Sequence, residues 1–161
     1  MAIRNIVQEG DAILAKKCRP VTEFNEKLHI LLDDMHETLA RADGAGLAAP
    51  QVGILRACAL VMVDDGSYLE IINPVIEETS GTQEGPEGCL SVPGRFGIVQ
   101  RPDHVQVKAQ DRNGNFFTYT ADGFTARAFC HEIDHLSGHL FTEKVTEYID
   151  PETYYGDSEE E

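Results

Sequence analysis

The sequence has no apolar run near the length of about 20 residues that a membrane-spanning helix needs, and its start lacks the apolar core of a signal peptide. Basic residues are few: 13 Lys and Arg stand against 28 Asp and Glu, which gives a formal net charge of −15. This charge disfavours close approach to phosphate backbones. We therefore expect an intracellular, cytoplasmic protein that neither enters a membrane nor binds nucleic acid directly.

Cysteine patterns that build small metal or redox modules are also missing. The four cysteines form no C-x-x-C pair, which argues against a zinc ribbon and a thioredoxin-like motif. Intracellular thiols usually stay reduced, and an isolated cysteine is usually a small buried apolar residue. The 161 residues, 42% of them hydrophobic, suffice for one compact core. We expect one domain over residues 1–150 and a frayed acidic tail over residues 151–161.

Two segments have the apolar periodicity of amphipathic helices: residues 23–41, which end before a D-G turn signal, and residues 123–136, which Gly138 can terminate. Between them, segments rich in branched and aromatic residues predict strands at residues 58–63, 68–76, 96–99, 105–109 and 116–120. Turn signals separate these strands at D-G 65–66, N-P 73–74, R-P 101–102 and N-G 113–114. The pattern indicates an α+β fold.

The strongest motif is H-E-I-D-H at residues 131–135, inside the second predicted helix. Residues four apart lie on the same face of a helix, so His131 and His135 can direct their imidazoles at one metal ion. Glu132 lies about a hundred degrees around the helix from His131, where it can reach a water on that ion without being a ligand. A solvated helix face that carries two histidines is the simpler alternative, but this spacing in a helical context favours a metal hydrolase.

A catalytic ion of this kind needs a third protein ligand. Metzincin proteases would place a histidine at position 141, which here is Phe141, and His139 comes two residues too early. A downstream glutamate, as in thermolysin-like proteases, would have to come from the last 26 residues, which include Pro151 and the acidic tail. Upstream, Cys89 lies in the glycine-flanked segment EGCLSVP of residues 87–93. It is a candidate ligand, and a buried unreactive thiol remains the alternative.

Three segments resemble the signature motifs of peptide deformylases: GAGLAAPQ at residues 44–51, EGCLS at residues 87–91 and HEIDH at residues 131–135. They occur in the order of that family and at similar separations, and the resemblance extends from the N-terminus to about residue 145. It implies a fold in which antiparallel or mixed sheets pack around a central helix that carries H-E-x-x-H, with an amphipathic helix nearer the N-terminus. It also implies removal of the formyl group from the N-terminal formylmethionine of new polypeptides, with release of formate.

The resemblance implies a role for each motif. Cys89, His131 and His135 would bind one divalent metal ion, with water as the fourth ligand. A thiolate ligand requires an ion softer than magnesium or calcium. The family usually uses ferrous iron, and zinc or nickel is often found after purification. The ion would polarise the formyl oxygen and activate the water, while Glu132 would act first as a general base and then as a general acid.

Other residues are assigned by the same resemblance. Gln51 and the backbone N–H of Leu90 would stabilise the developing oxyanion, although an incidental glutamine in a glycine-rich turn is the simpler interpretation of Gln51 taken alone. Glu87 and Arg101 would form a supporting ion pair. The substrate would contact the backbone of Gly46 as an added strand. Its methionine side chain would be surrounded by residues of the first and third motif regions and of the cysteine turn: Gly44, Ala45, Gly88, Phe124, Arg127 and Ala128.

The C-terminal end departs from the pattern common in bacterial members, whose basic C-terminal helix docks on the ribosome. This chain instead ends in acidic residues. We therefore expect no ribosome docking by that route, and the short end resembles organellar or phage-encoded members. We further expect a monomer that acts on N-formylmethionyl peptides and nascent chains. Two alternatives stay open: a small zincin peptidase with another third ligand, and a structural metal-binding domain without activity.

Overall fold

The computed structural model describes residues 2–150 and 152, and its first long element is helix α1 (Glu26–Ala42). The side chain of Asn25 caps the helix by accepting a hydrogen bond from Leu28 N at 3.2 Å. The helix ends at Asp43, which adopts the left-handed conformation (φ 56°). The predicted apolar stripe is buried. The helix predicted at residues 23–41 is confirmed, and it begins three residues later than predicted because Asn25 provides the cap.

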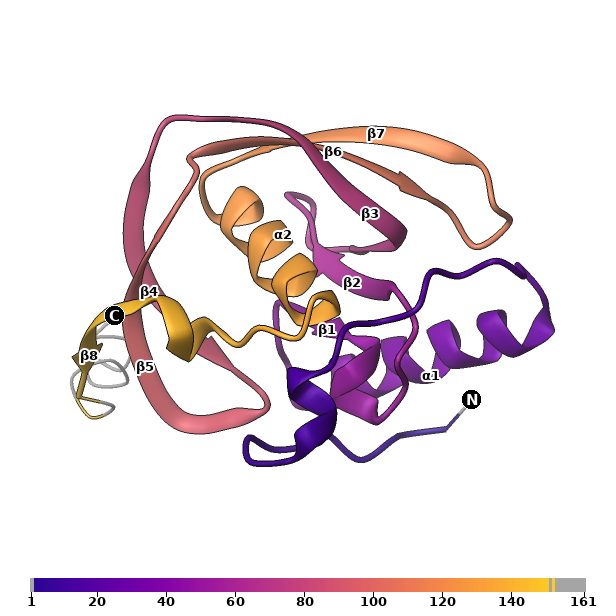
Figure 1. Ribbon diagram of the computed structural model, residues 1–161, viewed down its shortest axis with the longest axis horizontal. Coiled ribbons are helices and arrows are strands. Elements are labelled where there is room, and N and C mark those ends of the chain that lie inside the picture. Colours follow the sequence, from indigo (N-terminus) through magenta and orange to yellow (C-terminus); the bar gives the residue numbers. More distant parts are fainter. Residues whose placement is uncertain (1, 151, 153–161) are drawn as a thin grey trace.

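The larger sheet has five antiparallel strands in the order β1-β2-β3-β6-β7 (Figure 1). Its members are β1 (Gly46–Ala48), β2 (Cys58–Met62), β3 (Tyr68–Ser80), β6 (His104–Gln110) and β7 (Phe116–Asp122). Four of these strands overlap the predicted ones. The short strand β1 was not predicted, and it forms one edge of the sheet, beside β2.

The smaller sheet contains β4 (Gln83–Cys89), β5 (Val92–Arg101) and β8 (Val145–Ile149), again antiparallel, with β5 in the middle. Only the centre of β5 was predicted. β4 contains two glycines and Pro86, which lower strand propensity. Proline is tolerated there because β4 is an edge strand.

The expected turn at Asn73-Pro74 is wrong. β3 continues through both residues, and its pairing with β6 shifts register between Ile72 and Val75. Asn73 has a left-handed φ of 51°, and its side chain bonds to both the N–H and the carbonyl of Val21. The dipeptide therefore makes a bulge that bends the strand. The turns expected at D-G 65–66, R-P 101–102 and N-G 113–114 do separate strands.

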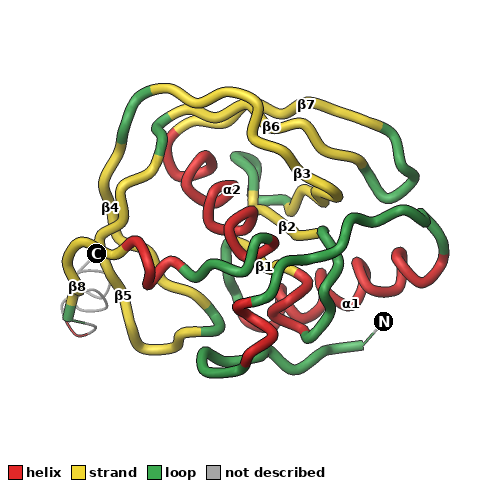
Figure 2. Tube along the Cα trace, in the orientation of Figure 1, coloured by secondary structure: helices red, strands yellow, loops and turns green. Residues whose placement is uncertain are grey.

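Helix α2 (Gly123–Leu136) has the bounds predicted for it and crosses the middle of the molecule between the sheets (Figures 1 and 2). Phe129 on this helix is fully buried in a cluster with residues of β2, β3, β6 and β7. Burial of one such side chain contributes about 1.5–3 kcal/mol. The α+β class, the central helix that carries H-E-x-x-H and the N-terminal amphipathic helix are all confirmed.

The described residues also form three short 3₁₀ helices: η1 (Ala12–Ala15), η2 (Ala49–Val52) and η3 (Phe141–Lys144). Neither α1 nor α2, nor any other helix in the described part of the chain, is long and apolar enough to cross a membrane. The tail predicted over residues 151–161 lies outside the described residues, apart from Glu152.

Candidate metal centre and catalytic site

The three expected ligands converge at one point. Cys89 is the last residue of β4, while His131 and His135 lie one turn apart on α2. Their ligand atoms all lie within 4.8 Å of one another, and Cys89 Sγ is 3.4 Å from His135 Nε2. One sulfur and two imidazole nitrogens suit a borderline or soft transition-metal ion. This donor set and its convergence fit the divalent metal that the sequence motifs imply.

A buried carboxylate orients the first histidine. Glu87 Oε1 lies 2.9 Å from His131 Nδ1. An ionised carboxylate can only accept, so Nδ1 must donate and Nε2 is left to bind a metal. Burial alone would raise the pKa of Glu87, but hydrogen bonds from Arg101 and His131 hold that pKa well below its ordinary value. Glu87 is therefore ionised at neutral pH.

Two arginines surround Glu87. Arg101 donates to both carboxylate oxygens, at 2.8 and 2.9 Å, and Arg127 donates to Oε2 at 2.7 Å. Arg101 also donates to Asp134 Oδ2 at 2.7 Å. The network joins β4 and β5 to helix α2, so it fixes the cysteine relative to the histidines. Asp134 was not predicted as part of the site, although it occupies a variable position inside the HEIDH motif.

Glu132 is buried beside the metal ligands, and its Oε1 has no hydrogen-bond partner among the described residues. Burial raises the pKa of its carboxyl to about 7. Gly46 of β1 packs against it closely: a Cβ atom at that position would lie 2.8 Å from Glu132 Cδ and 2.9 Å from Cγ, and closer still to Oε2. Only glycine at position 46 avoids a steric clash with the Glu132 carboxylate.

Gln51 belongs to η2, and its amide is held at both ends. Its Oε1 accepts from Ala48 N at 2.9 Å, while its Nε2 donates to Ser91 Oγ at 3.1 Å and lies 3.5 Å from Cys89 Sγ. This orientation aims the amide at the sulfur end of the metal centre. Ser91, which is fully buried, was missed as a site residue. Its place in the EGCLS segment was the available signal.

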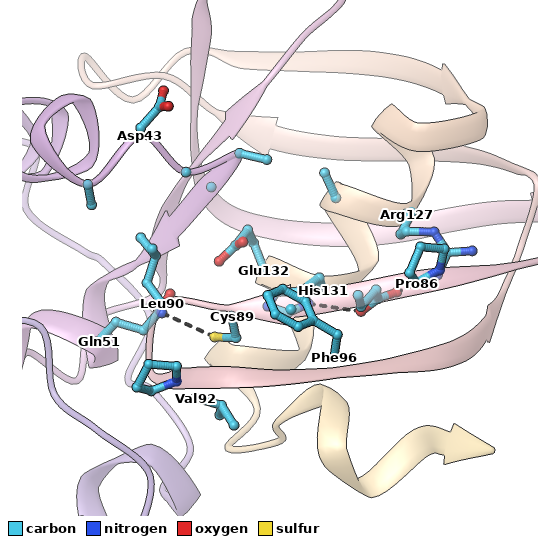
Figure 3. Close-up of a pocket in the computed structure, with 18 of the residues that line it drawn as sticks. Asp43, Gln51, Pro86, Cys89, Leu90, Val92, Phe96, Arg127, His131 and Glu132 are labelled. Carbon is cyan, nitrogen blue, oxygen red and sulfur yellow. Dashed lines mark hydrogen bonds and ion pairs between the residues drawn. The ribbon is translucent and has the colours of Figure 1, made fainter. Parts of the chain in front are cut away.

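A cavity of about 480 Å³ opens beside these groups (Figure 3). That volume is typical of a small-ligand pocket. Its walls include Gln51, Leu90, Glu132 and all of the predicted pocket residues: Gly44, Ala45, Gly46, Gly88, Phe124, Arg127 and Ala128. His135 and Arg101 do not line it. Sequence reasoning missed the walls supplied by Pro86, Val92 and Phe96.

Two of these wall residues differ in what they offer a ligand. Phe124 is 61% exposed at the start of α2, so its ring is available at the cavity rim. The guanidinium of Arg127 instead bonds to Glu87 and to the carbonyl oxygens of Gly85 and Val99. Arg127 therefore presents its surface to the cavity while its charge is held within the network.

Comparison with known proteins gives one consistent result. The family model described as polypeptide deformylase matches residues 3–149. Peptide deformylase 1 of Bacillus cereus is 52% identical over 151 residues, covering 93% of this chain and 97% of that protein. The peptide deformylase of Lachnoclostridium phytofermentans is 48% identical over the full length of both. Both of these relatives are bacterial proteins.

Comparison with solved structures identifies the same family as comparison with related sequences. The crystal structure of a peptide deformylase from Legionella pneumophila superposes with a TM-score of 0.87 at 41% identity, over 90% of this chain and 87% of that one. The crystal structure of the peptide deformylase from Thermotoga maritima superposes with a TM-score of 0.87 at 38% identity, over 91% of this chain and 99% of that one. Identity at this level over nearly the whole length establishes more than a shared fold. The chain belongs to the polypeptide deformylase family.

Proposed function

We propose that Cys89, His131 and His135 together hold one divalent metal ion with which this chain removes the formyl group from N-formylmethionyl peptides. The chain is a peptide deformylase, a hydrolase that removes the N-formyl group from new polypeptides and releases formate. The observation that carries the ligand assignment is the approach of Cys89, at the end of β4, to the two histidines of α2. It favours deformylation over both alternatives, because a zincin peptidase would use a different third ligand and a closed structural site would have four protein ligands.

The ion, when bound, supplies a Lewis acid for the formyl oxygen and makes water a better nucleophile. Ferrous iron is the proposed physiological ion, and zinc or nickel fits the same donors. Glu132 takes a proton from the attacking water and delivers it to the departing amine. Burial raises the pKa of the Glu132 carboxyl above its ordinary value, which suits a group that must first accept a proton and then release it.

Gln51 and the backbone N–H of Leu90 are the proposed donors to the oxyanion that develops on the formyl oxygen. The Ala48 N–H fixes Gln51 Oε1, so the Nε2 end is already turned toward Cys89 before substrate binds. A donor oriented in advance costs no reorganisation during the reaction. Glu87 and Arg101 act indirectly, by holding His131 and by joining the smaller sheet to α2.

The peptide chain of the substrate is proposed to pair with Gly46 on β1. This strand is an edge of the five-stranded sheet, so its outer backbone groups can accept another strand. The methionine side chain then enters the cavity, against Phe124, Ala128 and the surface of Arg127 on one side. Gly44, Ala45 and Gly88 leave the space that an unbranched side chain needs.

We propose that the enzyme acts in the cytoplasm as a monomer with a single catalytic domain over residues 1–150. Its partners are nascent chains and N-formylmethionyl peptides. Direct binding of nucleic acid is not part of the proposal, because the chain carries a net charge of −15.

The decisive assay is formate release from formyl-Met-Ala-Ser under anaerobic conditions, with iron or nickel supplied. Glu132→Gln should abolish release while metal content is unchanged. Glu37→Gln is the matched control, because Glu37 on α1 also has a buried carboxylate oxygen without a partner among the described residues but lies outside the cavity. Folded, metal-loaded wild type that releases no formate would refute the proposed chemistry.

The ligand assignment has its own test. Cys89→Ser should reduce bound metal and activity together. Cys18→Ser is the control, because Cys18 is a buried core thiol whose pKa burial raises to about 11. Full metal content and activity in Cys89→Ser would show that another residue is the third ligand.

A further inference from the structure

A second cavity, of about 510 Å³, lies on another part of the molecule. It is formed by the N-terminal segment, the first turns of α1 and residues 53–56, which directly follow η2. Figure 1 shows the N-terminal segment passing below α1. The cavity shares no lining residue with the catalytic cavity. Nothing in the deformylase mechanism uses it.

The charged residues that line this second cavity are all basic. Four of the 13 basic residues of the chain line it, and none of the 28 acidic residues does. Arg4 is neutralised by Asp34, with its Nη2 2.9 Å from Oδ2. Within residues 2–150 and 152, the other three cations form no ion pair; these are Arg19, Lys27 and Arg56. In a protein of net charge −15, this is a concentrated positive site.

Backbone pairing places Arg19 and Arg56 side by side. Arg19 and Arg56 face each other in an isolated parallel bridge, held by Arg19 N to Leu55 O and by Ala57 N to Arg19 O, both at 3.0 Å. Like charges directly opposite each other on paired strands are destabilising. Lys27 lies in the first turn of α1, where the helix dipole disfavours a cation. A bound anion would offset the unfavourable electrostatic interactions at all three positions.

The rest of the lining is apolar. Ile30 and Leu31 follow Lys27 by about one turn of α1, and Ile30 is 48% exposed. Ile13, Ile54 and Leu55 complete this surface. The cavity therefore combines three unpaired cations with a hydrophobic wall, which suits a compact ligand that has both a multiply charged anionic group and an apolar body.

We propose that this cavity binds an organic phosphate: a phosphate monoester whose apolar part packs on the isoleucine and leucine side chains. Guanidinium groups bind phosphate through two parallel hydrogen bonds, and a monoester carries close to two negative charges at pH 7. Arg19 and Arg56 are therefore the principal phosphate ligands. A phosphate of a folded RNA is the competing occupant, and it is disfavoured by the net charge of the protein and by the apolar wall.

Phenyl phosphate is the probe, and its binding to the metal-loaded enzyme is measured by calorimetry at low ionic strength. It should bind more tightly than inorganic phosphate, which has the charge without the apolar body. Arg19→Gln with Arg56→Gln should weaken phenyl phosphate by at least about tenfold, the loss expected for one charge-assisted hydrogen bond. Ile30→Ser should weaken phenyl phosphate and leave inorganic phosphate unchanged.

Arg95→Gln is the matched control, because Arg95 is an exposed arginine paired with Glu9 outside this cavity. Circular dichroism and formate release check that each variant is folded. Binding that is absent, that survives the double substitution, or that falls equally in Arg95→Gln would overturn the proposal. A short RNA duplex that binds through the same two arginines more tightly than phenyl phosphate would overturn it in favour of an RNA contact.

Discussion

Replacing Gly46 by alanine adds one methyl group directly against the proposed general base. The backbone of Gly46 is not in the left-handed region, so alanine is compatible with its conformation. The new Cβ would lie 2.8 Å from Glu132 Cδ and 2.9 Å from Cγ, separations that folded proteins do not tolerate. Since Glu132 Oε1 has no hydrogen bond to hold it among the described residues, the carboxylate is the group that yields.

The displacement sets the expected loss of activity. Restoring an ordinary contact moves the carboxylate by roughly 1 Å, and a misplacement of that size costs about a hundredfold in rate. This corresponds to about 2.7 kcal/mol of transition-state stabilisation. We expect kcat for formate release to fall by about that factor, with metal content unchanged because the three ligands are not touched.

Gly44→Ala is the control in the same segment. Its Cβ would meet the ends of the Leu90 and Leu39 side chains, at 3.0 and 3.1 Å, and these flexible groups can move aside. We expect less than about a tenfold loss for this variant. Wild-type kcat in Gly46→Ala, or equal losses in the two variants, would refute the argument that Gly46 provides the room for Glu132.

Three further predictions concern stability and metal binding. Glu87→Gln should weaken metal binding by about 10- to 100-fold in a metal titration, because His131 loses its orienting carboxylate. Although burial opposes it, the hydrogen bond from Arg112 lowers the pKa of Glu70 from 4.5 to about 2, so Glu70 contributes stability above pH 4.5 that is lost as the pH falls toward 2. At pH 7, the unfolding free energies of wild type and Glu70→Gln, measured with urea, should therefore differ by at most about 3 kcal/mol. At pH 3 the difference should be smaller. Phe129→Ala should lower the unfolding free energy by about 3–5 kcal/mol, and a cost below about 1 kcal/mol would contradict its place in the core.

Local periodicity by itself determines the two helices and much of the larger sheet. The apolar stripe of α1 and the bounds of α2 follow from residues three and four apart, which a helix brings together without help from the rest of the chain. His131, His135 and Glu132 share one helix, so their relative placement is a property of the sequence alone. The short edge strands β1 and β4 were not predicted, because their glycine and proline residues lower the strand propensity of the segments. Pairing with a neighbouring strand stabilises both of them in the fold.

Tertiary structure decided everything that joins distant segments. From its residues alone, Cys89 was either a ligand or an inert thiol, and only the packing of β4 against α2 places its sulfur 3.4 Å from His135 Nε2. The contact of Gln51 with Ser91 and the network around Glu87 likewise join residues about 40 positions apart. The second cavity gathers its cations from three separate segments. The sequence specifies the chemistry of each side chain, but which side chains come into contact depends on long-range packing, which local patterns do not encode.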